Sequence, residues 1–325
     1  MKTTPFLRAL FFSLLILPAL GAMAQDSDGD GIVDAADNCP SMANADQADA
    51  DGDNMGDACD ACPSFSNPGN MDCPAIIYQI KQGGFAPGSA VHLPNVIITA
   101  KGNDGFFVQV KAGDSGYTIP EHSGLFVHTG VLPSPLSTAS VGARVDIDGT
   151  VTLSAGRIIL DAVTGVTLLA FGPEVLPYPE PVSYADVISA GPRANALDGV
   201  IISLGPSAVT GVNTGTGEFT LTDGPSNALV VDDYLFMPSP APSIGQAYAS
   251  IFGILMASPS ASTLLPRSGM DLIATCTANG QCDDNNACTT DACANNACTY
   301  TLLPYSDSDG ICDATDNCPN TPGQQ

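Results

Sequence analysis

Short alternating runs of apolar and polar residues fill the middle of the chain, from residue 75 to residue 275. Val, Ile, Leu and Thr alternate with polar residues between turns rich in Gly and Pro, which is the pattern of half-buried strands. Helical periodicity is scarce, and the best short helix is Tyr184–Ala190. The pattern predicts a mainly β fold, with strands at Gly105–Val110, Gly124–His128, Ala143–Asp148 and Gly156–Leu160.

The same order of predicted strands occurs twice in this region. The two halves, residues 75–175 and 176–275, are each long enough to bury a core of their own. We therefore expect two consecutive β domains. The corresponding segments are Val96–Ala100 with Val200–Leu204, Gly105–Val110 with Gly217–Thr222, Leu125–His128 with Leu229–Asp232, and Val141–Val151 with Ile244–Leu255.

The first 24 residues have a different pattern, with a basic start and one apolar run. Lys2 and Arg8 precede the run Ala9–Leu20, and Ala22-Met23-Ala24 has the small residues of a cleavage site. The run is too short to span a membrane, and no later stretch reaches about 18 apolar residues. The sequence predicts a signal peptide cleaved near Ala24, no membrane span, and export to the cell envelope or the extracellular space.

Acidic loops flank the β region, and their spacing indicates metal binding. Five aspartates, Asp26, Asp28, Asp30, Asp34 and Asp37, occupy positions 1, 3, 5, 9 and 12 of a twelve-residue loop with Gly31 at position 6. This is the ligand spacing of a calcium loop, in which position 7 supplies a backbone carbonyl. The predicted second loop and the partial third loop follow the same order. The predicted ligands are Asp26, Asp28, Asp30, Ile32, Asp34 and Asp37; Asp49, Asp51, Asp53, Met55, Asp57 and Asp60; and Asp307, Asp309, Ile311, Asp313 and Asp316.

The loops differ in two positions. Asn54 replaces the glycine of position 6 in the second loop, and Asn tolerates a left-handed backbone better than most residues. Tyr305 stands at position 1 of the third loop and offers no carboxylate, so we expect a weaker third site. A solvated acidic linker is the alternative interpretation. The expected cofactor is Ca²⁺, with a structural role.

The acidic segments resemble thrombospondin type 3 repeats. The resemblance rests on Asp37-Asn38-Cys39-Pro40, on Asn44, Gln47 and the run Asp49–Asp60, and on Asp316-Asn317-Cys318-Pro319-Asn320. It covers about residues 26–62 and 305–323, within segments 25–74 and 305–325. It implies irregular backbone wrapped around calcium, with Asn44 and carbonyls near Gln47 as further ligands. It also implies a Cys39–Cys59 bridge, which leaves Cys62 and Cys73 as the other pair.

Eleven cysteines lie outside the β region, and export makes disulfides their default state. Residues 276–304 form a cysteine-rich module that resembles short C-T-x-D-x-C repeats of surface proteins, and its pairing is open. Its Asp283, Asp284 and Asp291 are a weaker cation candidate. Zinc or redox chemistry at Cys59-Asp-Ala-Cys62 is the alternative to disulfides. The odd total leaves Cys318 without a partner, which predicts a truncated sequence or a bridge to another molecule.

The strand order of the β region resembles OB-fold-like domains found beside secreted bacterial nucleases and phosphatases. The resemblance implies two tandem OB-like β-barrels. Nucleic-acid binding needs a basic groove with stacking aromatics, whereas this region has fifteen acidic residues against seven basic ones in the whole chain after residue 24. The chain has a net charge of −25 and no Trp. This field argues against nucleic acid as a partner.

No catalytic motif is present in the sequence. We find no G-x-S-x-G, no H-E-x-x-H and no phosphate-binding glycine loop. Asp146 with Asp148, and the histidines His122 and His128, are weak candidates that fit structural roles better. The sequence predicts a non-catalytic, secreted calcium-binding protein with a structural or adhesive role toward extracellular matrix, a glycan or a cell-surface protein. The alternatives are a glycan- or nucleic-acid-binding module and the N-terminal part of a secreted nuclease or phosphatase.

Overall fold

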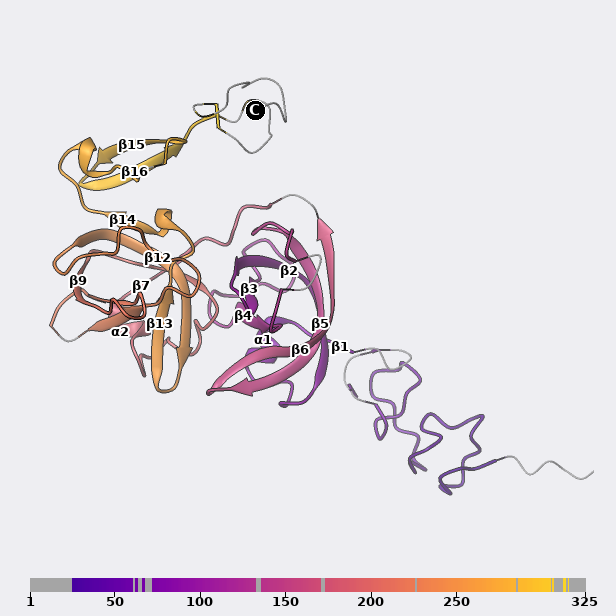
Figure 1. Ribbon diagram of the computed structural model, residues 1–325. Coiled ribbons are helices and arrows are strands. Elements are labelled where there is room, and N and C mark those ends of the chain that lie inside the picture. Colours follow the sequence, from indigo (N-terminus) through magenta and orange to yellow (C-terminus); the bar gives the residue numbers. More distant parts are fainter. Residues whose placement is uncertain are drawn as a thin grey trace, which may run out of the picture. The chain divides into compact units, whose positions relative to one another are not determined.

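The computed structural model describes residues 25–60, 62–63, 66–67, 72–132, 136–170, 173–225, 227–284, 286–304, 306, 312–313 and 315. The chain divides into two compact units, Met1–Asn70 and Met71–Gln325, and each is described by itself. The described residues of the first unit form turns and bends only. All the helices and strands of the described chain belong to the second unit (Figure 1). The predicted signal peptide, Met1–Ala24, lies outside the described residues.

The first sheet has six strands in the order β1-β2-β3-β4-β6-β5, and β2 also pairs with β5. Several bulges bend its long strands, among them one in β2 near Asn95 and one between β5 and β6 near Ala162, and both of these residues have positive φ. All five residues of β3 are buried, because its two faces both meet apolar side chains. The elements are β1 (Cys73–Pro74), α1 (Ile77–Lys81), β2 (Ala90–Lys101), β3 (Gly105–Gln109), β4 (Gly124–His128), β5 (Arg144–Ser154) and β6 (Arg157–Ala170).

The second sheet has eight strands in the order β13-β11-β10-β9-β12-β8-β7, with β14 on β12 and β13 also on β12. Ser183 caps its one α-helix: its Oγ accepts from Asp186 N, and Asp186 Oδ2 accepts from Ser183 N. The predicted helix is therefore present, but it ends sooner. The elements are β7 (Glu180–Val182), α2 (Tyr184–Val187), β8 (Ile201–Leu204), β9 (Ser207–Val212), β10 (Phe219–Thr222), β11 (Ala228–Val231), β12 (Ala247–Ser258), β13 (Ala261–Leu265), η1 (Gly269–Asp271) and β14 (Leu272–Ala274).

The predicted mainly β class is confirmed, but the two sheets are not closed into true barrels. Long antiparallel ladders run around most of each sheet. The parallel seam between β4 and β6 consists of a single pair, Val127↔Leu160. The seam between β11 and β13 has two pairs, Val230↔Thr263 and Val231↔Leu264. Strongly twisted strands that cross at such a seam diverge after one or two residues, so the ladder does not continue. The prediction of closed barrels was wrong in this respect.

The two sheets share a buried apolar layer. Phe107 of β3 and Ile254 of β12 are fully buried in one cluster, together with Ile201. A Cβ on Gly124 would lie 2.3 Å from the backbone of Gly199, so these two backbone segments approach each other closely. The sheets therefore pack as one body.

A buried ion cluster accompanies this layer. The Asp198 carboxylate accepts from Lys81 Nζ at 2.7 Å, from Arg157 Nε at 2.8 Å and from the N–H of Ala257 at 2.9 Å. These donors come from α1, β6 and β12, so one carboxylate joins elements of both sheets. Removing it would leave two buried cations without their partner.

Disulfides hold the cysteine-rich module around one hairpin. Strands β15 (Thr289–Ala294) and β16 (Ala297–Leu302) are joined through Asn295 and Asn296, both at positive φ, as a two-residue hairpin turn requires. A 3-10 turn, η2 (Asn279–Gln281), precedes them. The pairing left open by the sequence is Cys276–Cys293, Cys282–Cys298 and Cys288–Cys312. No helix among the described residues is long and apolar enough to cross a membrane.

Candidate metal centre

The carboxylates of the first acidic loop are held by the N–H groups of the loop itself. Asp26 accepts from Gly29 N at 2.7 Å and from Gly31 N at 3.1 Å. Asp28 Oδ1 accepts from Asp30 N at 3.2 Å, and Asp30 Oδ1 accepts from Ile32 N at 2.8 Å. These bonds turn the carboxylates of Asp26, Asp28 and Asp30 toward one another, with ligand oxygens within 4.8 Å. The structure thus brings the predicted ligands of positions 1, 3 and 5 together.

The second loop repeats this geometry 23 residues later. Asp49 accepts from Gly52 N at 2.7 Å and from Asn54 N at 3.1 Å. Asp51 and Asp53 accept from the N–H groups two residues after them, at 3.2 and 2.9 Å. Asn54 has φ +74°, so it adopts the left-handed conformation that the sequence predicted for position 6. Two different sequences therefore fold into the same arrangement of carboxylates.

Each loop contains two carboxylate oxygens that are buried and have no hydrogen-bond partner. They are Asp28 Oδ2 and Asp37 Oδ2 in the first loop, and Asp51 Oδ2 and Asp60 Oδ2 in the second. A polar atom that is shielded from solvent and has no partner is unfavourable, yet the same two positions, 3 and 12, have one in both loops.

A cation fits this arrangement better than water does. A Ca–O distance is about 2.3–2.6 Å, shorter than the about 2.7–2.8 Å of an O–H···O bond. A dehydrated cation therefore fits against oxygens that water does not reach. All the donors are hard oxygens, which suit calcium.

The electrostatics of position 3 agree with a site built for positive charge. Burial raises the pKa of Asp28, and the negative charges of Asp30, Asp37 and Asp26 raise it further. Burial likewise raises the pKa of Asp51, with added contributions from its neighbouring aspartates. Position 12 thus lies close enough to position 3 to act on its titration in each loop.

Position 9 braces the loop. Asp34 accepts from both the N–H and the hydroxyl of Ser27, each at 2.7 Å. Asp57 accepts from Ala50 N at 2.8 Å, and Asp313 accepts from the N–H and the hydroxyl of Ser306 at 2.8 and 2.6 Å. A carboxylate engaged in this way acts on a cation through its remaining lone pairs or through a water molecule.

The third loop shares a backbone bond with the other two. Asp313 N donates to Pro304 O at 3.0 Å, as Asp34 N donates to Gln25 O and Asp57 N donates to Ala48 O, both at 2.8 Å. The other predicted ligands of this loop, Asp307, Asp309, Ile311 and Asp316, lie outside the described residues.

The predicted carbonyl ligands at position 7 are compatible with a cation. Within the described part of the two loops, the carbonyl oxygens of Ile32 and Met55 accept no hydrogen bond. Their N–H groups are used by Asp30 and Asp53.

One connection that the sequence did not predict joins each loop to an Asn that lies fourteen residues after position 5. Asp30 Oδ2 accepts from Asn44 N at 2.8 Å, and Asp53 Oδ2 accepts from Asn67 N at 2.7 Å. Asn44 is one of the further metal ligands that the family resemblance implies, whereas no role is predicted for Asn67. The recurrence of an Asn fourteen residues after position 5 was the available sign. Both residues are buried, at 8% and 1% exposure, so the connection is part of the interior.

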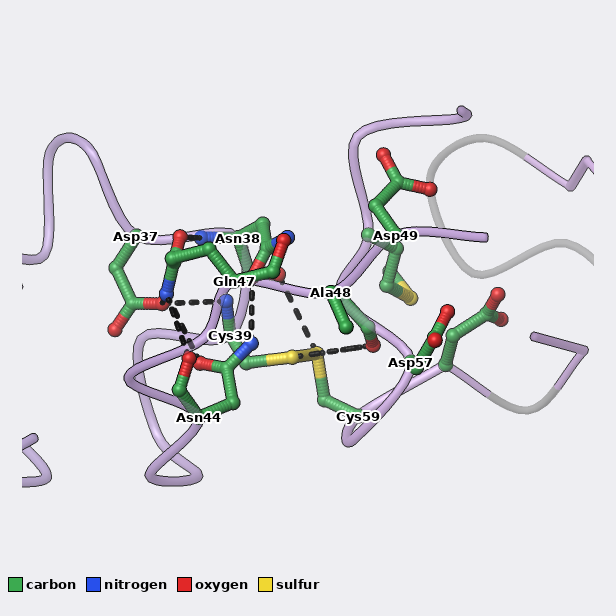
Figure 2. The surroundings of a disulfide bond; sticks show 12 residues. Asp37, Asn38, Cys39, Asn44, Gln47, Ala48, Asp49, Asp57 and Cys59 are labelled. Carbon is green, nitrogen blue, oxygen red and sulfur yellow. Dashed lines mark hydrogen bonds between the residues drawn. A yellow bond between two sulfur atoms is a disulfide. The ribbon is translucent and has the colours of Figure 1, made fainter. Parts of the chain in front are cut away.

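Amide side chains surround the disulfide between the loops (Figure 2). The predicted Cys39–Cys59 bridge is present, with an S–S distance of 2.03 Å. Asn38 N donates to Gln47 Oε1 at 3.0 Å, and Asn44 Nδ2 donates to Asn38 Oδ1 at 2.6 Å. Gln47 Nε2 donates to Asp37 Oδ1 at 2.8 Å. Cys39 N also donates to Asp37 Oδ1 at 2.8 Å, so the disulfide is linked directly to a position 12 carboxylate.

Gly56 is required by this network. A Cβ at residue 56 would lie 2.4 Å from Asn38 Oδ1, 2.6 Å from Asn44 Nδ2 and 2.7 Å from Cys39 Sγ. Cys62 and Cys73, the other predicted pair, are each disulfide-bonded.

The remaining chemical candidates serve the β region. Asp148 bonds His92 Nδ1 at 2.6 Å, and Asp146 accepts from Asn95 N at 2.8 Å. His128 Nδ1 bonds Asp161 at 3.0 Å. The sulfurs of Cys276, Cys282 and Cys293 lie close together, but all three belong to disulfides. These contacts give the residues structural partners.

Comparison with known proteins gives a match over the first and third acidic loops, and the second loop lies outside the matched segments. A family model of the thrombospondin type 3 repeat matches residues 24–47 and 306–325. No curated protein matches the chain. Among solved structures, the hypothetical protein ygiW from E. coli is similar at 15% identity, covering 33% of this chain and 98% of its own, with a TM-score of 0.23. Two segments of the chain are thus similar to thrombospondin type 3 repeats, which are calcium-binding structural modules.

Proposed function

We propose that this protein is an exported, non-catalytic calcium-binding protein in which Ca²⁺ rigidifies the acidic repeats on either side of a β body. One observation carries the proposal: the buried, unpartnered oxygens occur at positions 3 and 12 of both described loops. Hydrogen bonds already orient the other carboxylates, so each loop presents a prepared set of oxygens. Bound calcium would supply positive charge and the missing partners.

The proposed ligands of the first site are the carboxylates of Asp26, Asp28, Asp30 and Asp37 and the carbonyl of Ile32. Asp49, Asp51, Asp53, Asp60 and Met55 are their counterparts. Mg²⁺ is a poorer fit, because it prefers a strict octahedron and retains several waters. Extracellular calcium is abundant enough to fill sites of modest affinity.

The role proposed for the ion is structural. Every carboxylate of the two described loops accepts from nearby backbone or side-chain donors, and the described part of the first unit buries little apolar surface. Calcium then replaces a hydrophobic core as the source of order, and the repeats act as spacers or adhesive modules. The partner proposed for such a module is extracellular matrix, a glycan or a cell-surface protein.

We further propose that each sheet is OB-like. The pairings run β2-β3-β4-β6-β5 and return to β2, and those of the second sheet run β9-β10-β11-β13-β12 and return to β9. This order supports the OB-like assignment, since OB folds are partly open five-stranded barrels.

Calorimetry with Ca²⁺ on the chain from Gln25 to Gln325 tests the proposal. We expect binding in the micromolar to millimolar range, about 10⁻⁶–10⁻³ M, as for sensor and extracellular sites. Asp28→Asn with Asp51→Asn should remove the heat of two sites. Asp46→Asn is the matched control, because Asp46 is exposed in the same segment but occupies no ligand position. Absence of binding at millimolar calcium would refute the proposal.

A further inference from the structure

A cavity of about 440 Å³ lies where the two sheets meet. Its wall comes from the end of β2, from Val141 before β5, from Leu176 in the segment that joins the sheets, from Leu235 after β11, and from the turn around η1. This volume is within the range of about 300–1,000 Å³ that is typical of small-molecule sites. The cavity is far from the acidic loops in sequence and plays no part in the proposed calcium binding.

The wall is largely apolar. Leu176 and Leu235 are partly buried against the layer shared by the two sheets. Val141 and Met270 remain 37% and 45% exposed. Thr99 is also part of the wall, and its buried hydroxyl has no hydrogen-bond partner. Apolar side chains with a few polar groups are what small-molecule sites commonly present.

One side chain of the wall carries an unbalanced positive charge. Among the described Lys and Arg residues, Lys101 is alone in having no ion pair. Its Nζ donates to two carbonyls, Ala139 O at 2.6 Å and Leu136 O at 3.3 Å, which leaves a third N–H available. An ammonium group that is partly buried without a counterion is stabilised by any anion brought beside it.

The acidic residue of the wall does not cancel this charge. Asp271 is 6% exposed and pairs with Arg267, through Nε at 2.9 Å and Nη2 at 2.7 Å. The pair is neutral, so the wall has a net charge of +1. This local charge contrasts with a chain whose net charge is −25.

We propose that the cavity binds a small amphipathic carboxylate, with its apolar part against Leu176, Leu235 and Met270 and its carboxylate at Lys101. The charge selects an anion over an alcohol or an amine of the same chain length. Among the described residues of the wall no side chain is aromatic, so these residues offer no platform for stacking a sugar or a base.

Calorimetry with octanoate, 1-octanol and octylammonium tests the proposal on the chain from Gln25 to Gln325. Octanoate should bind about tenfold more tightly than the other two probes, since only its headgroup brings a negative charge to the Lys101 ammonium, and a hydrogen bond between two charged groups is stronger than one to a neutral oxygen. Lys101→Gln should lower octanoate affinity about tenfold and leave octanol binding unchanged. Lys111→Gln is the matched control, because Lys111 pairs with Glu174 and is not part of the wall.

A second measurement locates the bound probe. The chain has no Trp, so Val141→Trp at the rim provides a single fluorophore whose emission should shift to the blue with octanoate. Circular dichroism confirms that each variant is folded. Equal binding of octanoate and octanol, no effect of Lys101→Gln in a folded variant, or no heat with any probe would each overturn the proposal.

Discussion

The acidic repeats and the two sheets bury different kinds of side chain. In the described part of the first unit, the buried side chains are two cysteines, Cys39 and Cys62, and the polar residues Asn44, Asp53, Asp60 and Asn67. The sheets instead bury aromatic and branched aliphatic residues such as Phe106, Phe107 and Ile147. We therefore expect the stability of the sheets to come from apolar burial, and, on the proposed function, that of the repeats to depend also on calcium in solution.

Because of this difference, we expect different kinds of substitution to destabilise the two regions. Burial of apolar surface is non-directional and tolerates small shifts. Carboxylates that share a cation depend on the position of each oxygen, and without the cation they repel one another. We expect the sheets to respond to changes in volume, and the repeats to respond to changes in charge, in cross-links and in backbone geometry. Four predictions test this contrast, in order of decreasing effect.

Phe107→Ala should destabilise the sheets by about 3–5 kcal/mol, because it removes a buried ring from the layer that both sheets share. The ring of Phe126, 4.8 Å away, would lose its neighbour. Denaturant unfolding followed by circular dichroism measures the loss. Calcium binding by the repeats should remain at native affinity, and its loss would show that the two regions are not independent.

Replacing Cys39 and Cys59 by Ser together should cost the calcium-free repeats about 3 kcal/mol. The bridge spans 20 residues, and a closed loop of this size restricts the unfolded chain by about that amount. Hydrogen exchange of residues 25–60 should accelerate, and calcium should restore part of the protection. Unchanged exchange in the calcium-free protein would mean that the hydrogen bonds alone order this segment.

Gly56→Ala should destabilise the repeats by about 1–3 kcal/mol through overpacking. The new Cβ meets Asn38, Asn44 and Cys39 at less than van der Waals distance. Gly205→Ala in the second sheet is the control, because nothing lies within 4 Å of its Cβ position. The effect should appear as weaker calcium affinity in the Gly56 variant alone.

Acid should act on the two regions in opposite directions in metal-free protein. Hydrogen bonds from Arg144, and then from Lys111, lower the pKa of Glu174 to about 2. A lowered pKa stabilises the fold above the usual Glu range and loses that contribution as the pH falls toward 2. Burial raises the pKa values of Asp28 and Asp51. The destabilisation caused by burying these two charges is complete above the raised pKa values, and it is removed as the pH falls toward the usual Asp range.

Protection factors measured at pH 7, 5 and 3 with a chelator present check this prediction. The repeats should gain protection between pH 7 and 3, whereas the sheets should hold theirs down to the Glu range and lose it below. With saturating calcium the trend in the repeats should reverse, because protons compete with the ion. If the protection factors of both regions fell together in metal-free protein, buried charge at Asp28 and Asp51 would not be destabilising the repeats.

The local parts of the structure were predictable from sequence. Alternation gave the strands at 105–109, 124–128 and 144–154 because those residues bury one or both faces. The aspartate spacing gave both described loops, because each ligand is set by its own turn. The helix at Ile77–Lys81 was missed, since five residues are too few for a periodic pattern.

Long-range features were not predictable in the same way. The close approach of Gly124 and Gly199, and the convergence of Lys81 and Arg157 on Asp198, depend on how two sheets pack. The cystine pairs of residues 276–312 depend on which sulfurs the hairpin brings together, and six cysteines permit fifteen arrangements. The cavity at Lys101 forms only when segments that are far apart in the sequence come together, so no single run of residues predicts it.

The Cys39–Cys59 bridge also determines how the repeats would respond to a pulling force. The bridge holds two Cα atoms 5.7 Å apart across 20 residues, which would otherwise extend to roughly 70 Å. Tension along the chain passes through the sulfur–sulfur bond and bypasses Asp49, Asp51, Asp53 and Asp57 inside the closed ring. Asp26–Asp37 lies outside this ring, so the tension passes through its backbone. The first loop would therefore extend before the ring that holds most of the second loop, which makes it the extensible element of the pair.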